Sequence, residues 1–359
     1  MTPLEKVSRE KTYLRRMLLA WFRRNARDLP WRRSRDPYLV LVAEILLQQT
    51  RLEMMLPYYE RFTKAFPTVS DLAGADEDRL MKLWEGLGYY RRARHLHRAA
   101  KLIVNEFGGR LPQRADEWQR LPGIGRYTAG AIASIAFGER VPVLDGNVKR
   151  VLSRLFAIET CVDEAETQRL LWSIAEKLVP EKVPGDFNQA LMELGSRICT
   201  PKSPRCDECP VRKRCDARAL GRQRSLPVRR EKRPVPHYHV VAAAIVKNGR
   251  YLLGKRPVAD MLGGLWEFPG GKIKPNETHE QALVRELKEE LDTEITVGPL
   301  VASVNHAYSH FKITLHVYRC RHVGGRPRPI YYTEVKWVLR RQFARYAFPT
   351  ADRKVLHLL

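Results

Sequence analysis

The sequence predicts two domains, an all-helical domain followed by a smaller α+β domain. From Tyr13 to about residue 219, apolar residues recur at intervals of three and four, the spacing of amphipathic helices. After residue 238 the pattern changes to short runs rich in Val, Ile and aromatic residues, which are typical of strands. A stretch dense in Arg and Pro separates the two. We therefore place the domains at 1–219 and 238–359, joined by a linker at 220–237.

Start and stop signals divide the first region into many short helices. Asp36 and Pro37 can cap and open a helix that contains residues 39–47, because an Asp side chain accepts from free N–H groups and proline fits the first turn. Another helix opens near Arg126. Gly138 can end it, since glycine adopts the left-handed conformation easily.

The linker and the second domain differ in texture from the helical region. Three prolines stiffen the linker, and six Lys and Arg residues, among them Lys232 and Arg233, make it strongly basic. Beyond it, one helix is expected at 278–291. The expected strands lie at 240–246, 251–253, 313–318 and 335–338.

The net charge points to an anionic partner. With 64 Lys and Arg against 40 Asp and Glu, the formal charge is +24. Such an excess of positive charge repels itself unless it faces an anion, and nucleic acid is the leading candidate for that anion. The alternative is a basic surface that contacts only solvent. No apolar run approaches the roughly 20 residues that span a bilayer. We expect a cytoplasmic, monomeric protein that binds nucleic acid and no membrane.

Four of the six cysteines, Cys199, Cys206, Cys209 and Cys215, fall within seventeen residues. No secretory signal precedes them, so a disulfide scaffold is not indicated. Four thiolates from one loop suit either a tetrahedral zinc ion or a four-iron cluster. Zinc sites more often pair two Cys-x2-Cys units, and only Cys206 and Cys209 have that spacing. Spacing alone leaves both metals open.

Gly123 and Gly125 lie between Leu121-Pro122 and a stretch rich in small residues. They permit a tight turn between two helices and leave the N–H groups of the second helix exposed at its start. Such a helix end binds phosphate through its unpaired donors and its dipole. The pattern favours a helix-hairpin-helix over a plain helix connection.

Two carboxylates occupy positions that suggest chemistry. Glu44 interrupts the apolar run 39–47, where desolvation would raise its pKa and let it act as a general acid; alternatively it lies on the one wet face of its helix. Asp145 precedes another helical run and is either an N-cap or a catalytic carboxylate. A capping carboxylate can do both, because its second oxygen stays free.

Together these motifs resemble the MutY adenine DNA glycosylases of the endonuclease III superfamily. The resemblance rests on Glu44 with Leu47-Gln-Gln-Thr50, on Gly86-Leu-Gly-Tyr-Tyr90, on the hairpin, on Leu144-Asp-Gly-Asn147 and on the four cysteines, in that order. It covers nearly the whole chain. It implies a helix-hairpin-helix glycosylase domain with a [4Fe-4S] cluster in loop 199–215. The implied activity is base-excision repair of double-stranded DNA, with removal of adenine opposite 8-oxoguanine or guanine.

The resemblance also implies roles for single residues. Glu44 would protonate adenine at N7, and Asp145 would stabilise the cationic sugar, as in glycoside hydrolysis. Tyr127 and Asn147 would position this chemistry. Extruding the base costs a few kcal/mol, which stacking and pocket contacts must offset. The expected DNA and base contacts in the first domain are Arg27, Trp31, Gln48, Gln49, Thr50, Tyr89, Gly123, Gly125 and Gln189.

Tyr127 also bears on the reaction type. In relatives of this superfamily that cut the DNA strand, the residue two positions after the second hairpin glycine is a lysine that forms a Schiff base. Tyrosine cannot form an imine, so the resemblance implies a monofunctional glycosylase without efficient lyase activity.

A loop in the second domain resembles the one with which this family reads 8-oxoguanine. The family usually carries Phe-Ser-His, and here the residues are Tyr308, Ser309 and His310. Ser309 and His310 can reach the Hoogsteen edge of a purine, so we expect them to recognise the lesion. The alternative for His310 is an ordinary strand histidine.

The second domain further resembles the MutT pyrophosphatases of the Nudix family. Its motif is Gly271-x5-Glu277-x7-Arg285-Glu286-Leu287-x-Glu289-Glu290, and Glu286, Glu289 and Glu290 could hold Mg²⁺. Asp292 replaces the late glycine of the motif, which puts hydrolysis in doubt. The alternatives to adenine excision alone are a protein that also, or instead, hydrolyses oxidised dGTP, a non-catalytic lesion binder, and a glycosylase for another base.

Overall fold

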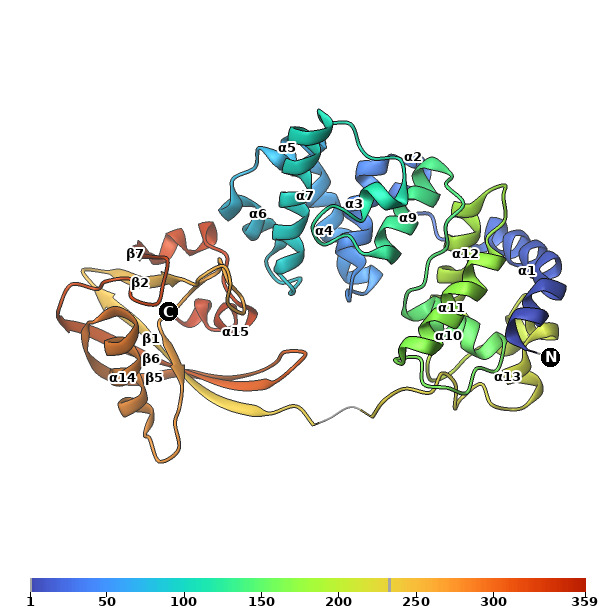
Figure 1. Cartoon of the computed structure of the whole chain (residues 1–359). Helices are drawn as coiled ribbons and strands as arrows, with labels where there is room; N and C mark the ends of the chain where they lie inside the picture. Colours follow the sequence, from blue (N-terminus) through green and yellow to red (C-terminus); the bar gives the residue numbers. More distant parts are fainter. Residues whose placement is uncertain (1, 232–233) are drawn as a thin grey trace. The chain divides into compact units, whose positions relative to one another are not determined.

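The computed structural model describes residues 2–231 and 234–359, which fall into two compact units (Figure 1). The linker residues Lys232 and Arg233 lie outside the described residues. One unit comprises Met1–Gly74 and His95–Lys232, and the other Ala75–Arg94 and Arg233–Leu359. A segment from the middle of the helical region thus groups with the C-terminal part. The domain limits 1–219, 220–237 and 238–359 stay predictions.

The first unit is helical, as the sequence predicts. Its helices pack mainly through α1 with α11 and α12, α3 with α4 and α9, and α10 with α12. They are α1 (Pro3–Asn25), α2 (Pro30–Ser34), α3 (Pro37–Leu47), α4 (Leu52–Ala65), α5 (Val69–Ala73), α7 (Arg91–Phe107), α8 (Ala115–Trp118), α9 (Arg126–Phe137), α10 (Gly146–Leu155), α11 (Ala165–Leu178), α12 (Pro184–Arg197), η1 (Cys206–Glu208), η2 (Arg212–Arg214) and α13 (Asp216–Ala219). Helix α7 begins within the segment that groups with the second unit.

The predicted start of α3 and the predicted end of α9 are confirmed. Asp36 caps α3 by accepting from the N–H of Leu39 at 2.9 Å. Gly138 ends α9 in the left-handed conformation, with φ of 72°. The start of the helical region was placed too late, because α1 begins at Pro3. Thr2 and Glu5 form a capping box there, which stabilises the first turn ahead of the apolar pattern.

The expected helix-hairpin-helix is formed by α8, a tight turn and α9. Gly123 has φ of 80°, and a Cβ atom at this position would lie 2.6 Å from the Cβ of His95. A side chain would therefore be both strained and obstructed. Gly125 is the N-cap of α9 and makes no side-chain capping bond. The first N–H groups of α9 thus have no capping side chain, as phosphate binding requires.

The second unit is built on a mixed sheet. It also contains α6, which belongs to the segment Ala75–Arg94. The strand order is β3-β2-β1-β6-β5, with β4 pairing to β1 and β7 to β2. Strands β1 and β6 are parallel, and the other described pairs are antiparallel. The elements are α6 (Glu77–Trp84), β1 (His237–Lys247), β2 (Arg250–Lys255), β3 (Trp266–Glu267), β4 (Gly270–Lys272), α14 (His279–Leu291), β5 (Glu294–Ala307), β6 (Lys312–Gly324), β7 (Glu334–Leu339), η3 (Arg340–Arg345), α15 (Thr350–Arg353) and η4 (Leu356–Leu358).

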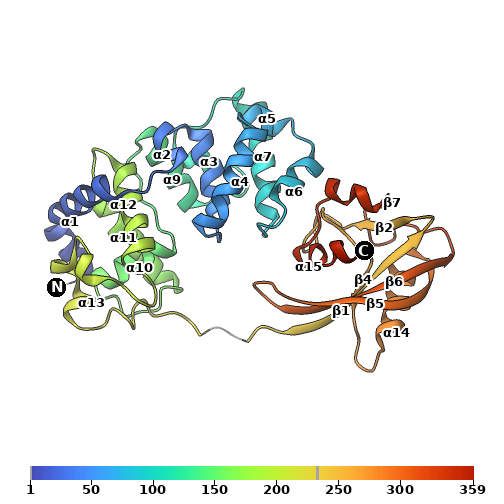
Figure 2. The same ribbon diagram turned by 180° about the vertical axis from the view of Figure 1, so that it is seen from behind.

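The sheet is covered on both faces (Figures 1 and 2). Val241, Ala243 and Ile245 of β1 pack with apolar residues of α14 on one face. The alternate residues Ala242 and Ala244 pack with the C-terminal segment on the other. This alternation follows from the two-residue period of a strand.

Strands β3, β4 and β5 and the short helix α15 were not predicted from the sequence. Strand β5 contains Gly298 and Pro299 and shows three shifts of register against β6, so its side chains do not alternate regularly.

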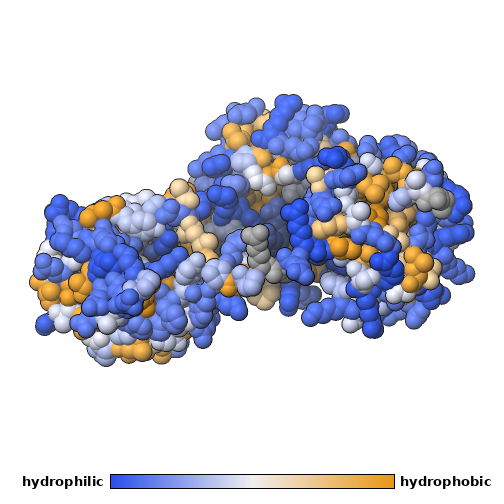
Figure 3. Space-filling model, turned by 60° about the horizontal axis from the view of Figure 1, so that its bottom comes forward, coloured by the Kyte–Doolittle hydropathy of each residue, from blue (hydrophilic) through white to orange (hydrophobic). Residues whose placement is uncertain are grey.

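Within residues 2–231 and 234–359, no helix is long and apolar enough to cross a membrane. Hydrophilic residues cover most of the face seen in Figure 3.

Candidate active site

A cavity of about 1060 Å³ opens in the first unit between α2, α3, α9, α10 and α12. It brings together most of the residues predicted from the first domain. Those that line it are Glu44, Asp145, Tyr127, Asn147, Arg27, Trp31, Gln48, Gln49, Thr50, Gly125 and Gln189. Gly123 lies in the hairpin turn, and Tyr89 belongs to the second unit.

Glu44 is buried at the wall of this cavity, with 3% of its surface exposed. It therefore does not lie on a wet face of α3. Burial raises the pKa of Glu44 to about 7, against the opposing effect of the Tyr127 hydroxyl, which donates to Oε2 at 2.8 Å. The negative charge of Asp145 raises it further. The carboxyl group is thus poised to hold and release a proton near neutral pH.

Asp145 is the N-cap of α10. Its Oδ1 accepts from the N–H of Val148 at 2.7 Å, and its Oδ2 accepts from Nδ2 of Asn147 at 2.9 Å. The expectation of a free second oxygen was therefore incomplete, because Asn147 occupies one of its lone pairs. Burial raises the pKa of Asp145, whereas these hydrogen bonds oppose the rise and favour the ionised form.

Arg27 and Gln189 are fixed in the cavity by a network that the sequence did not reveal. Glu193, with a side chain only 1% exposed, accepts from Arg27 at 2.7 Å and from Arg32 at 2.9 Å. Arg32 also donates to Oε1 of Gln189 at 3.0 Å. Burial alone would raise the pKa of Glu193, but the two guanidinium groups hold it below its ordinary value. The available signal was Glu193 itself, a charge inside the apolar run 190–194.

The remaining wall is built by the end of α3 and by an aromatic pair. Gln48 donates to the hydroxyl of Thr128 at 3.2 Å, and Gln49 has a left-handed backbone with φ of 57°. Trp31 is 3% exposed and packs against Tyr59, with 5.0 Å between ring centroids. A flat apolar wall of this kind can pack against a planar ring.

Helix α10 joins the cavity to the cysteine loop. Arg150 donates to Oδ1 of Asn147 at 2.8 Å and to the carbonyl of Cys199 at 2.6 Å. One turn further, Arg154 donates to Sγ of Cys199 at 3.4 Å and accepts with its carbonyl from Sγ of Cys215 at 3.4 Å. A continuous series of hydrogen bonds therefore runs from Asp145 to the cysteine loop. No local sequence pattern marks either arginine as functional.

The four cysteines lie in the segment between α12 and α13, where they could hold a metal centre. Burial, together with the charges of Cys199, Cys215 and Cys206, raises the pKa of Cys209 to about 12, so all four thiols are neighbours. Four neighbouring thiols in one loop suit a four-iron cluster with one thiolate on each iron, and also a zinc ion.

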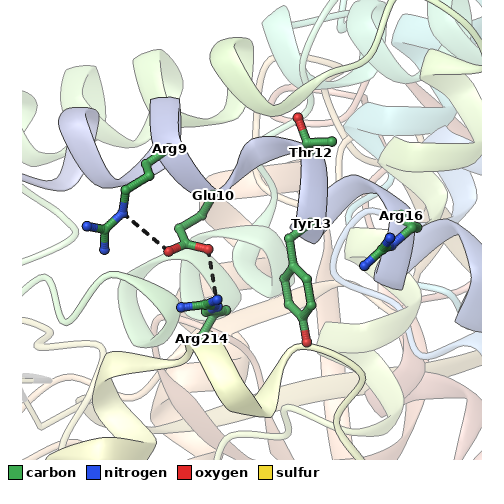
Figure 4. A pocket seen from close by; sticks show the side chains of 6 residues that line it. All are labelled: Arg9, Glu10, Thr12, Tyr13, Arg16 and Arg214. Atoms are coloured by element: carbon green, nitrogen blue, oxygen red, sulfur yellow. Dashed lines mark ion pairs between the residues drawn. The ribbon is translucent and has the colours of Figure 1, made fainter.

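The cysteine loop is also held by α1 (Figure 4). Glu10, only 5% exposed, lies between Arg9 and Arg214, at 3.5 and 3.3 Å. One turn earlier, buried Lys6 donates to the carbonyl of Arg214 at 3.0 Å and pairs with Asp216 at 2.5 Å. The first helix thus fixes the last part of the loop from more than 200 positions away.

The predicted lesion-reading residues lie in the second unit, on the turn between β5 and β6. Ser309 and His310 are exposed, and Tyr308 packs on Phe311 with 4.9 Å between ring centroids. The hydroxyl of Tyr89 forms a hydrogen bond with Oγ of Ser309. Tyr89, predicted as a DNA contact, is therefore adjacent to the predicted lesion loop within one compact unit.

The three glutamates of the Nudix motif have other partners. Glu286 and Glu289 both pair with Arg285, at 2.8 and 3.2 Å. Glu290 accepts from the hydroxyl of Tyr332 at 2.8 Å, and burial raises its pKa to about 8. They are not among any metal-holding group that the described residues form.

Comparison with known proteins identifies three families of sequence models in the chain. The model of HhH-GPD superfamily base excision DNA repair proteins matches residues 42–177. The iron–sulfur binding domain of endonuclease III matches residues 199–215, and the NUDIX domain matches residues 240–358. These segments contain the hairpin, the four cysteines and the second sheet, respectively.

Curated relatives extend over most of the chain. An adenine DNA glycosylase of Rattus norvegicus is 36% identical over 402 residues, which cover 97% of this chain and 78% of the relative. One of Buchnera aphidicola subsp. Acyrthosiphon pisum is 34% identical, covering 82% and 83%. A solved thermostable thymine-DNA glycosylase matches with a TM-score of 0.54 and 30% identity, over 59% of this chain and 98% of that one.

A structure of endonuclease III with DNA matches with a TM-score of 0.50 and 24% identity, over 60% of this chain and 98% of that one, and so supports the fold alone. The identity to the curated relatives, and its extent, go beyond fold. The chain belongs to the adenine DNA glycosylase family, with a helix-hairpin-helix domain, an iron–sulfur loop and a C-terminal Nudix domain.

Proposed function

We propose that this chain hydrolyses the N-glycosidic bond of adenine paired with 8-oxoguanine or guanine in double-stranded DNA. The observation that carries the proposal is the placement of Glu44 and Asp145 on one cavity, with the pKa of Glu44 raised to about 7. An acid near neutrality and a hydrogen-bonded carboxylate are the two groups that glycoside cleavage uses.

In the proposed reaction, the flipped adenine enters the cavity and Glu44 protonates N7. The bond between C1′ and N9 then breaks, and its electron pair leaves with the neutral base. Asp145, whose ionised form is favoured by the hydrogen bonds from Val148 and Asn147, stabilises the positive charge on the sugar. Water adds to C1′ and releases a proton, which leaves an abasic site.

We assign the contacts around the base to the walls of the cavity. Trp31 supplies a flat apolar surface, and Arg27 and Gln189 supply polar groups whose positions Glu193 and Arg32 fix. Gln48, Gln49 and Thr50, at the end of α3, would fill the space that the base vacates in the duplex. The glycine turn before α9 would hold a phosphate.

The enzyme is proposed to be monofunctional. Tyr127 donates its hydroxyl proton to Glu44 and also contacts Sδ of Met192 at 3.2 Å. A phenol cannot form an imine with the abasic sugar. We expect the DNA strand to break only after heat or alkali, and abundant β-elimination product from the purified enzyme would contradict this.

The cysteines Cys199, Cys206, Cys209 and Cys215 are proposed to hold a [4Fe-4S] cluster. The cluster would cross-link the loop, and the thiolate charge fits the guanidinium of Arg154 at Cys199. Arg150 would transmit the loop position to Asn147. The proposed role of the cluster is therefore to set the geometry of α10 at Asp145.

Lesion recognition is assigned to Tyr308, Ser309 and His310, with Tyr89 beside them. Exposed hydroxyl and imidazole groups can reach the Hoogsteen edge on which 8-oxoguanine differs from guanine. We do not extend the proposal to hydrolysis of oxidised dGTP or to Mg²⁺, because Glu286, Glu289 and Glu290 are engaged by Arg285 and Tyr332.

The decisive assay measures single-turnover excision from duplexes with adenine opposite 8-oxoguanine, guanine or thymine, on the monomer we expect. Excision should be fastest opposite 8-oxoguanine. Glu44→Gln should lower the rate about 10²–10⁴-fold, whereas Glu60→Gln, an exposed glutamate of α4, should leave it unchanged. Equal rates opposite all three partners would refute the lesion specificity. A Glu44→Gln variant that stays active would refute the mechanism.

A further inference from the structure

Four histidines form a connected group on the side of the sheet that faces α14. His237 and His239 precede Val241 on β1 at two-residue intervals, so they share the face on which Val241 packs with α14. His316 lies on β6, and His279 is the first residue of α14. Neither adenine excision nor the Nudix motif accounts for this group.

The central pair of imidazoles has the spacing of two ligands of one metal ion. Nδ1 of His239 lies 3.2 Å from Nε2 of His316, and the rings are nearly parallel, at 10°. Two nitrogens on a tetrahedral ion, each at about 2.0–2.1 Å, lie about 3.4 Å apart. An ion could therefore replace the proton that the two rings share, with small rotations of the rings.

The outer nitrogen of His316 has the partner that metal-binding histidines usually have. Its Nδ1 is hydrogen-bonded to Oγ of Ser303 at 2.7 Å, which leaves Nε2 free to direct a lone pair towards His239. A neutral imidazole is the form that binds a metal.

Two further imidazoles flank this pair. The ring of His279 lies 4.3 Å from that of His316, and its Nδ1 is hydrogen-bonded to the hydroxyl of Tyr318 at 2.8 Å. The ring of His237 stacks on His239 at 5.3 Å. Nδ1 of His279 thus has an oxygen partner that orients the ring, as Nδ1 of His316 has.

We propose that His239 and His316 form a binding site for a borderline divalent ion of the Zn²⁺, Ni²⁺ or Cu²⁺ type, with His279 as a third ligand after a rotamer change. Among the described residues, no three such side chains already surround one point, so the resting site offers two nitrogens and water completes the coordination. Imidazole nitrogen suits these ions and not Mg²⁺ or Ca²⁺. A bound ion would cross-link β1 and β6, next to the turn that carries Tyr308–His310.

The test uses the full chain with its cluster intact and without a polyhistidine tag. Zn²⁺ is titrated by calorimetry at pH 7.5, and Cu²⁺ is added for electron paramagnetic resonance. We expect one ion per chain and nitrogen hyperfine splitting. The His239→Gln/His316→Gln variant should lose at least tenfold in affinity, and Ser303→Ala, which removes only the orienting hydroxyl, about tenfold.

Matched controls separate this site from other metal binding. The His322→Gln/His357→Gln variant changes two histidines outside the group and should bind as the parent does. Iron content and cluster absorbance are followed throughout, because an emptied cysteine loop would itself take Zn²⁺. Unchanged Zn²⁺ affinity in the His239→Gln/His316→Gln variant, or a Cu²⁺ signal without nitrogen coupling, overturns the proposal.

Discussion

The pH dependence of adenine excision tests the role of Glu44 most directly. A general acid must be protonated at the start of the reaction, and burial raises the pKa of Glu44 to about 7. The group is then about 90% protonated at pH 6 and about 10% protonated at pH 8. The single-turnover rate constant should therefore fall about tenfold between these values, with its midpoint near pH 7.

Replacing Tyr127 by Phe should move that midpoint in a defined direction. The hydroxyl of Tyr127 lowers the pKa of Glu44 by donating to it, while burial is unchanged by the substitution. Hydrogen bonds to charged groups contribute about 1.5–3 kcal/mol, and one pKa unit corresponds to about 1.4 kcal/mol. The midpoint should rise by one to two pH units at most, so the variant should stay active at a more alkaline pH than the parent.

The measurement is a set of single-turnover time courses from pH 5.5 to 9 on a duplex with adenine opposite 8-oxoguanine. The midpoint is compared and the maximal rate is not, because Tyr127 also packs against Met192. Tyr58→Phe, a change of α4, serves as the control. A profile that is flat between pH 6 and 8, or a midpoint that falls in Tyr127→Phe, would refute the reasoning.

Three other perturbations have defined outcomes. Arg150→Met should remove the link between Asn147 and Cys199 and leave the buried carbonyl of Gly195 unpaired, at a cost of about 1–3 kcal/mol for that acceptor. Unchanged urea unfolding and unchanged excision would contradict this prediction. Lys6→Met should speed cluster loss during dilution, followed by absorbance, whereas Lys11→Met should not. Burial raises the pKa of Asp352 to about 8, and the nearby Glu267 charge adds to the rise. The folded state therefore binds a proton that the unfolded chain releases near pH 4, so stability falls between about pH 4 and 8, by at most about 1.4 kcal/mol per unit. Asp352→Asn should flatten this slope in urea unfolding at pH 6 and pH 8, and an unchanged slope would exclude it.

The features that could be predicted from the sequence are those that depend on neighbouring residues. The cap at Asp36, the end at Gly138 and the burial of Glu44 follow from neighbouring residues, and the structure confirms them. The pairing of Glu193 with Arg27 joins positions 166 apart, and no local pattern predicts which residue is the partner of Glu193.

The same distinction holds in the second unit. Helix α14 has a capping residue and a clear apolar stripe, and its predicted span differs by one residue from the observed His279–Leu291. Strand β5 has an irregular register that only its partner β6 explains. The hydrogen bond from Tyr332 to Glu290 could not be predicted from motif spacing, because Tyr332 lies 42 positions beyond Glu290.

The grouping of Ala75–Arg94 with the C-terminal sheet affects how the chain can be divided for experiments. Lys255 pairs with Asp78 at 2.6 Å, and the N–H of Phe348 donates to Glu85 at 2.8 Å. A fragment that starts at the linker would lack both acceptors, although it would contain every strand. Expressed alone, it would misrepresent the stability of the lesion-reading half, and a faithful fragment would need α6 supplied by fusion or in trans.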